Sequence, residues 1–258
     1  MSLQINPDFE KWAMGFSGCD GGNLNGSIWF CGIEWGGGSE EDWLKDSVSK
    51  FEYVIEPYSI NDEDIEERKK ELIPQYNAKL LKMYSVLLGK EAKDYKETAL
   101  AYKYLGKNGH IFKMNLYPIA FGDTKDDLWD FHHYKLTGFP TKTTYKAWCQ
   151  INRFNKIREW LQENKPKAII CTGVTLHKEF LMAFCGFENI HEEVKKLEKI
   201  IIDDRYFYWM AINNNQSFLF IIPFFGNPYG LNKDEQIINI GKKIREICVI
   251  NYGEKWLE

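Results

Sequence analysis

The order of apolar and polar positions divides the chain into short apolar runs and longer amphipathic segments. Four runs are mostly apolar and rich in β-branched and aromatic residues, and each predicts a buried strand: residues 28–33, 111–115, 168–172 and 218–225. Buried strands of this kind, separated by helices, are typical of a parallel sheet with both faces covered. The pattern therefore predicts an α/β protein.

Helical periodicity accounts for most of the remaining chain. Apolar residues recur at helical spacing through residues 62–88, with an interruption at Pro74, and through residues 143–164, which the pattern predicts as a single helix. Shorter helices are predicted at residues 6–14, 41–50, 94–105, 176–184 and 233–249. The helices between the first two strands form a predicted helical insert at about residues 41–107 within a single domain of residues 1–258.

Three further segments have neither the helical nor the buried-strand pattern. Residues 17–26 are polar and rich in glycine, and residues 122–140 have no clear period, so both are predicted to be loops. Two short runs, residues 200–203 and 206–212, flank the turn-like residues 203–205 and predict a β-hairpin.

Charge and cysteine usage narrow the choice of partners and compartment. The net charge is −4, and residues 39–72 hold twelve Asp or Glu against five Lys or Arg, so the total charge gives no support to a polyanionic partner. None of the six cysteines forms a CxxC pair, and Cys31 and Cys171 lie in apolar runs, which predicts buried free thiols. We expect a cytoplasmic protein without a metal, cofactor or membrane partner; the adjacent His132 and His133 are predicted to lie on a loop surface.

Polar side chains follow three of the predicted strands. Glu34, Asn115 and Asn227 each come where an apolar run ends, so a parallel sheet would place all three at one edge. A carboxylate there can activate water, and an asparagine amide offers both a donor and an acceptor to a base edge. The alternative is structural: Glu34 caps a helix or pairs with a lysine, Asn115 bonds a turn, and the Asn227–Pro228 dipeptide forms a turn.

The order of the motifs resembles that of the uracil-DNA glycosylase superfamily. The segments that carry the resemblance are GIEWG (32–36), MNLYP (114–118), KPKAIICTG (165–173) and NPYGL (227–231), the last being similar to the mismatch-specific branch. The resemblance implies a three-layer α/β/α fold with a central, mostly parallel four-stranded sheet. Trp35 stands where the family has proline, and Tyr229 stands where it has serine.

The resemblance also implies a function and a set of site residues. Glu34 would orient water, Asn227 would stabilise the departing base, and Asn115 would read a base flipped out of DNA. Trp35, Tyr117 or Phe121 would stack on that base. The remaining residues expected to bind substrate surround these motifs: Gly32, Ile33, Gly36, Pro228 and Tyr229.

Alternative functions stay open. One is a catalytically inactive module of the same fold that binds a nucleobase, nucleotide or nucleic acid, and another is a small-molecule hydrolase that uses Glu34. A set of basic residues either contacts phosphate or is a solvated helix face: Lys142, Lys146, Arg153, Lys156 and Arg158.

Overall fold

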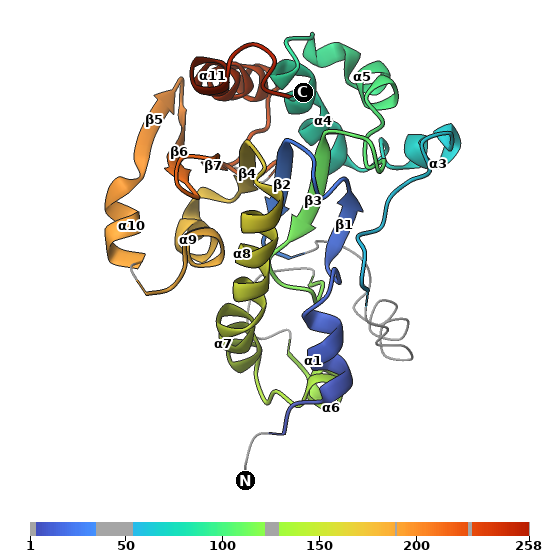
Figure 1. The fold of residues 1–258 in the computed structure, drawn as a ribbon, viewed down its shortest axis with the longest axis vertical. Helices are drawn as coiled ribbons and strands as arrows, with labels where there is room; N and C mark the ends of the chain where they lie inside the picture. The colour runs from blue at the N-terminus through green and yellow to red at the C-terminus, as the bar shows by residue number, and fades with distance from the viewer. Residues whose placement is uncertain (1–3, 35–53, 122–128, 189, 227–228, 258) are drawn as a thin grey trace.

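A single mixed β-sheet organises the protein. The computed structural model describes residues 4–34, 54–121, 129–188, 190–226 and 229–257 (Figure 1). Within these residues the sheet has seven strands in the order β1-β3-β2-β4-β7-β6-β5.

Four neighbouring strands at the centre of the sheet run parallel. They are β3 (Ile111–Asn115), β2 (Ile28–Gly32), β4 (Ala168–Thr172) and β7 (Ser217–Ile222). Every residue of β4 and β7 is buried, which explains the continuous apolar runs. The prediction of a parallel core in an α/β protein is confirmed.

The prediction that the sheet has only four strands is wrong, because three antiparallel strands extend it at both ends. They are β1 (Cys19–Gly22), β6 (Arg205–Ile212) and β5 (Glu198–Ile202), the last two forming the predicted hairpin. The polar segment predicted as a loop contains β1. Gly21 and Gly22 have positive φ, and a side chain at either would meet a backbone carbonyl oxygen, of Tyr58 or Ile111, so β1 carries no apolar signal.

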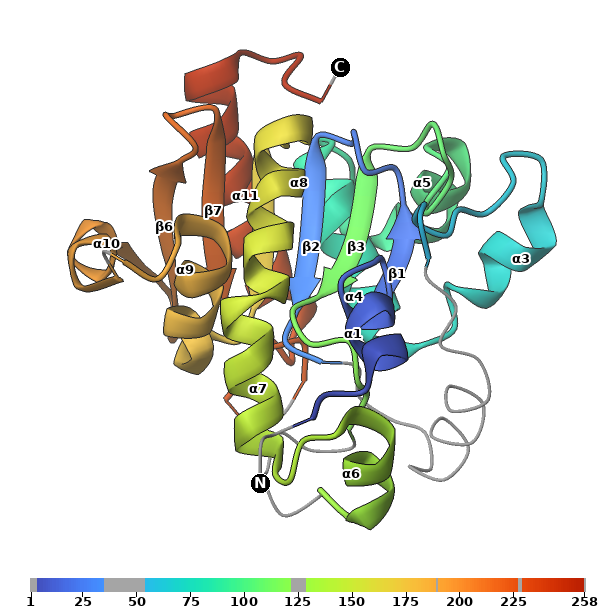
Figure 2. The ribbon, with the colours of Figure 1, turned by 60° about the horizontal axis from the view of Figure 1, so that its bottom comes forward.

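Helices cover both faces of the sheet (Figure 2). One face packs against α1 (Pro7–Ala13), α7 (Lys142–Ile151), α8 (Arg153–Asn164) and α9 (His177–Cys185). The opposite face packs against α4 (Gln75–Leu87), α5 (Tyr95–Ala101) and α11 (Asp234–Tyr252). Shorter elements complete the fold: α3 (Ile65–Lys70), α6 (Phe131–Thr137), α10 (Ile190–Lys196) and 3₁₀ turns at Ala92–Asp94 and Val174–Leu176. No helix in the described part of the chain is long and apolar enough to cross a membrane.

Two local predictions are corrected. The segment predicted as a loop at residues 122–140 contains α6, which begins where the Asp130 carboxylate accepts hydrogen bonds from the N–H groups of His132 and His133. The helix predicted at residues 143–164 is two helices that meet at Asn152, whose side chain donates to the carbonyl of Trp148 at 3.0 Å. The helix predicted at residues 41–50 lies outside the described residues.

Candidate functional site

Glu34 follows the central strand β2 at the carboxyl edge of the parallel core. Where the two strands end, the N–H of Leu116 donates to Gly32 O at 3.0 Å, and the N–H of Tyr117 donates to Ile33 O at 2.9 Å. These two bonds hold the segments after β2 and β3 side by side. The Glu34 side chain is only 5% exposed, so this carboxylate lies inside the protein.

A lysine from α7 contacts the Glu34 carboxylate. Lys142 Nζ lies 3.3 Å from Glu34 Oε1, and the Lys142 side chain is completely buried. The same ammonium lies 3.7 Å from the centre of the Phe121 ring, a cation–π contact. The interpretation that Glu34 pairs with a lysine is therefore confirmed, while Glu34 retains one uncommitted oxygen: Oε2 is buried without a hydrogen-bond partner among the described residues.

The surroundings of Glu34 bring the pKa of its carboxyl group close to 7. Burial raises the pKa of Glu34 from its ordinary value of 4.5 to about 7, because desolvation penalises the carboxylate. Lys142 and, more weakly, Lys146 oppose this shift, and Glu179 adds to it. A carboxyl group poised in this way can accept or donate a proton near pH 7.

A second polar cluster lies beside the first, on the same face of α7. The Tyr117 hydroxyl donates to Glu179 Oε2 at 2.6 Å and accepts from Gln150 Nε2 at 3.1 Å. Lys146 Nζ lies 3.8 Å from Glu179 Oε1. Lys142, Lys146 and Gln150 are spaced four residues apart, so one stripe of α7 serves both carboxylates.

Asn115 belongs to a different polar network. Its Nδ2 donates to Gly18 O at 3.1 Å and to Asp20 Oδ2 at 3.4 Å, and its side chain is buried. Asp20 also pairs with Lys113 at 2.8 Å, and Lys113 bonds Asn77 of α4. Both donor hydrogens of the Asn115 amide are therefore used within the protein, but their acceptors belong to β1 and the residue before it, and not to the turn that the structural alternative expected.

Gly32 and Ile33 use their carbonyl groups in the bonds to Leu116 and Tyr117, and the other predicted site residues divide into three groups. Phe121 and Tyr117 are buried, and Phe121 faces Lys142, so neither ring is open for stacking in this conformation. Tyr229 is 86% exposed. Four predicted residues lie outside the described ones: Trp35, Gly36, Asn227 and Pro228.

The five basic residues for which the sequence left open a phosphate-contacting or a solvated helix face do not share one exposed face, because two of them, Lys142 and Arg153, are buried. Lys142 is buried against Glu34, and the Arg153 guanidinium donates to backbone carbonyls of Leu116, Gly15 and Ser17. Arg158 donates to Met182 O at 2.7 Å, at the end of α9. Lys142 and Arg153 therefore make contacts inside the protein, to Glu34 and to backbone carbonyl groups.

The described residues contain no group of three or more His, Cys, Asp and Glu that could hold a metal ion. His133 is buried beneath the start of α6, so the prediction of a surface histidine there is wrong. All six cysteines are free thiols, and Cys31 and Cys171 are buried as predicted.

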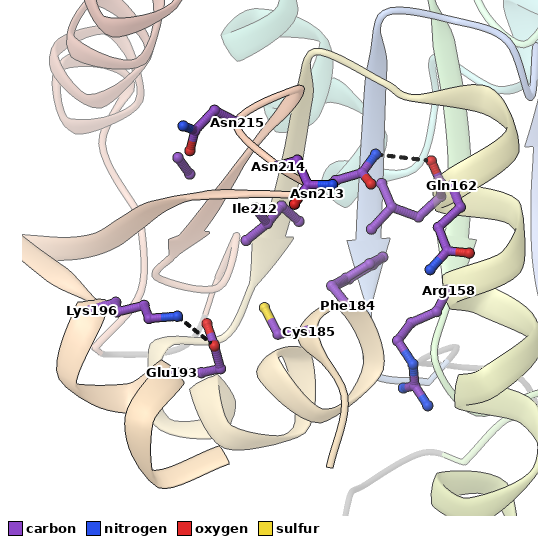
Figure 3. Close-up of a pocket in the computed structure, with 12 residues that line it drawn as sticks. Arg158, Gln162, Phe184, Cys185, Glu193, Lys196, Ile212, Asn213, Asn214 and Asn215 are labelled. Atoms are coloured by element: carbon purple, nitrogen blue, oxygen red, sulfur yellow. Dashed lines mark hydrogen bonds and ion pairs between the residues drawn. The ribbon is translucent and has the colours of Figure 1, made fainter. Parts of the chain in front are cut away.

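A pocket of about 420 Å³ lies at the opposite edge of the sheet (Figure 3). It is lined by Arg158, Cys185, the Glu193–Lys196 ion pair and the turn of Asn213, Asn214 and Asn215, which precedes β7. Parallel strands place the start of β7 far from the end of β2, so this pocket and Glu34 occupy different edges. The sequence contained one signal for the turn, three consecutive asparagines, and all three adopt positive φ.

Glu179 and Gln150 were not predicted as site residues, and Lys142 and Lys146 were not assigned to the site. The four-residue spacing of Lys142, Lys146 and Gln150 is visible in the sequence, but it does not show which face of the helix points toward the sheet.

Fold and site together define an α/β protein with a buried acid at the carboxyl edge of a parallel four-stranded core. Comparison of the chain with protein-family models and with curated proteins finds no match.

Proposed function

We propose that the protein is a DNA base-excision N-glycosylase-like hydrolase that removes uracil or another altered base. The observation that carries the proposal is Glu34, a buried carboxyl group just after a central parallel strand, one oxygen of which has no hydrogen-bond partner among the described residues. Ligand sites of open α/β sheets lie at this edge.

The arrangement of the core supports the resemblance noted in the sequence. The four parallel strands follow the order β3-β2-β4-β7; Glu34 follows β2, Asn115 is the last residue of β3, and Tyr229 lies in the segment after β7. This order along the chain is compatible with the resemblance.

The chemistry requires an ionised Glu34. Above its pKa of about 7, the carboxylate accepts a proton from water as the water attacks C1′ of the deoxyribose, and its charge offsets the positive charge of the sugar. The N-glycosidic bond breaks, and its electron pair leaves with the base. Asn227 and backbone N–H groups are proposed to stabilise the base anion.

One observation favours a second candidate, the inactive module that binds a nucleobase, nucleotide or nucleic acid. Lys142 already occupies Oε1 of Glu34, and both side chains are buried. In that case the Glu34 carboxylate has a structural role, and the site at this edge of the sheet binds its ligand without catalysing a reaction.

Base release from labelled oligonucleotides separates the two candidates. The substrates carry uracil, hypoxanthine or xanthine in single- and double-stranded DNA, and alkali reveals the abasic sites. We expect strand breaks with the wild type that disappear in Glu34→Gln and persist in Glu159→Gln, a matched change at a surface ion pair of α8. If the folded wild-type protein releases no base from any of these substrates, the proposed hydrolase activity is wrong, and the binding module is the remaining candidate.

A further inference from the structure

The start of α7 is fixed by a reciprocal cap. The N–H of Thr144 donates to Thr141 Oγ1 at 3.1 Å, and the N–H of Thr141 donates to Thr144 Oγ1 at 3.2 Å. Lys142 is the first residue of the helix, so the cap determines where its side chain leaves the backbone. The side chain then runs to Glu34, beneath the Phe121 ring.

The contact between Lys142 and Glu34 is one-sided. Lys142 meets Oε1, while Oε2 has no partner among the described residues. Holding one oxygen fixes the orientation of the carboxylate and leaves the other oxygen able to take a proton. A buried pair that served stability alone would be expected to satisfy both oxygens.

Charged groups from two helices act on Glu34. Lys142 and Lys146 of α7 favour its ionised form, and Glu179 of α9 opposes it. Tyr145 also lies near Glu34, and burial raises its pKa well above the ordinary value, so it stays neutral. Lys146 pairs with Glu179, so within the described part of the chain Lys142 is the cation in direct contact with Glu34.

We propose that Lys142 is a positioning residue of the Glu34 site: its ammonium orients the carboxylate and keeps the ionised form available, without touching the substrate. Its part in catalysis rests on the proposed function. The charge of Lys146, one helical turn further along α7, also favours the ionised form of Glu34, but more weakly.

The test compares four variants by two measurements. Lys142→Met removes the charge at similar length, Lys142→Arg keeps it, Lys146→Met removes the more distant charge, and Lys156→Met is the control at a surface pair. The first measurement is the titration of the Glu34 carboxyl by isotope-edited infrared spectroscopy, assigned by the band that Glu34→Gln removes. The second is the pH profile of kcat and KM for base release.

We expect the Glu34 midpoint to rise by about one to three pH units in Lys142→Met, by less in Lys146→Met and not at all in Lys156→Met. In Lys142→Arg it should stay near the wild-type value. At pH 7, kcat of Lys142→Met should fall roughly tenfold for each unit of that rise, with KM unchanged, and should recover at higher pH.

The two measurements separate this proposal from the function on which it rests. An unchanged midpoint in folded Lys142→Met overturns the positioning role even if the wild type releases base. A raised midpoint in a protein that releases no base supports the positioning of Glu34 and overturns the glycosylase. If Lys142→Met does not fold, Lys146→Met decides, because its partly exposed side chain tolerates the change and an unmoved midpoint there also counts against the proposal.

Discussion

Asn115 occupies the space that a side chain at position 32 would need. Gly32 and Asn115 are register partners at the ends of β2 and β3, and a Cβ on Gly32 would overlap the Asn115 Oδ1 atom. The two residues are therefore matched in size. Gly32, two residues before Glu34, leaves room for the Asn115 amide, which donates a hydrogen bond to Gly18 O.

Gly32→Ala should reduce stability by about 1–3 kcal/mol, because the new methyl group displaces a buried, hydrogen-bonded amide. Urea unfolding measures the loss. Adding Asn115→Ala should make the alanine at position 32 cost less than it does alone. Equal costs in the two backgrounds would show that the overlap is relieved elsewhere.

The raised pKa of Glu34 predicts how stability changes with pH. Between about pH 4.5 and 7 the folded protein holds a proton on Glu34 that the unfolded chain has lost, so the free energy of unfolding falls as the pH rises. The loss is on the order of 3 kcal/mol over this window. Glu34→Gln cannot ionise and should lack this decline.

Comparing the wild type with Glu34→Gln isolates the contribution of Glu34, because the other acidic residues contribute equally to the pH dependence of stability in both proteins. Unfolding is measured at pH 4.5, 6 and 8 for both proteins. Glu34→Gln should gain stability relative to the wild type as the pH rises and then level off above about pH 8. Parallel pH curves would mean that Glu34 is ionised throughout the range.

Tyr117→Phe should destabilise the protein by about 1–3 kcal/mol, because Glu179 loses the donor at 2.6 Å and Gln150 loses its acceptor. Tyr134→Phe on α6 is the matched control, since that residue is 47% exposed, and should change stability by less than about 0.5 kcal/mol. Thermal unfolding compares them. Similar effects of the two changes would contradict the importance of the Tyr117 hydroxyl.

Arg153→Lys should be strongly destabilising even though it keeps the positive charge. The guanidinium spans carbonyls of Leu116, Gly15 and Ser17, and a single ammonium group cannot reach all of them. We expect a loss of about 2–5 kcal/mol, measured by chemical unfolding. Lys156→Arg, the reverse exchange at a surface pair, should be neutral.

The sequence predicted the centre of the sheet well because burial on both faces leaves a strong local signal. Strands β2, β4 and β7 are continuous apolar runs, and the hairpin of β5 and β6 flanks a recognisable turn. Strand β1 left no such signal, since its glycines accommodate neighbouring backbone rather than pack side chains. Helix α6 was missed because its start depends on one capping residue, Asp130, in a segment without periodicity.

The candidate site was predicted only in part. A charge that ends an apolar run identified Glu34, but its partner lies 108 residues away, and only the packing of α7 on the sheet brings Lys142 to it. Asn115 looked equivalent to Glu34 at a neighbouring strand end. The structure separates them because β1, unrecognised in the sequence, supplies Asp20 and so draws Asn115 into its own network.

The stripe of Lys142, Lys146 and Gln150 makes three contacts depend on the length of one loop. A helix turns by about 100° per residue, so a single-residue insertion between Thr141 and Lys142 would swing all three side chains off the site together. Point substitutions remove these contacts one at a time, whereas a change in loop length removes them at once. Insertions and deletions just before α7 should therefore be more damaging than their surface location suggests.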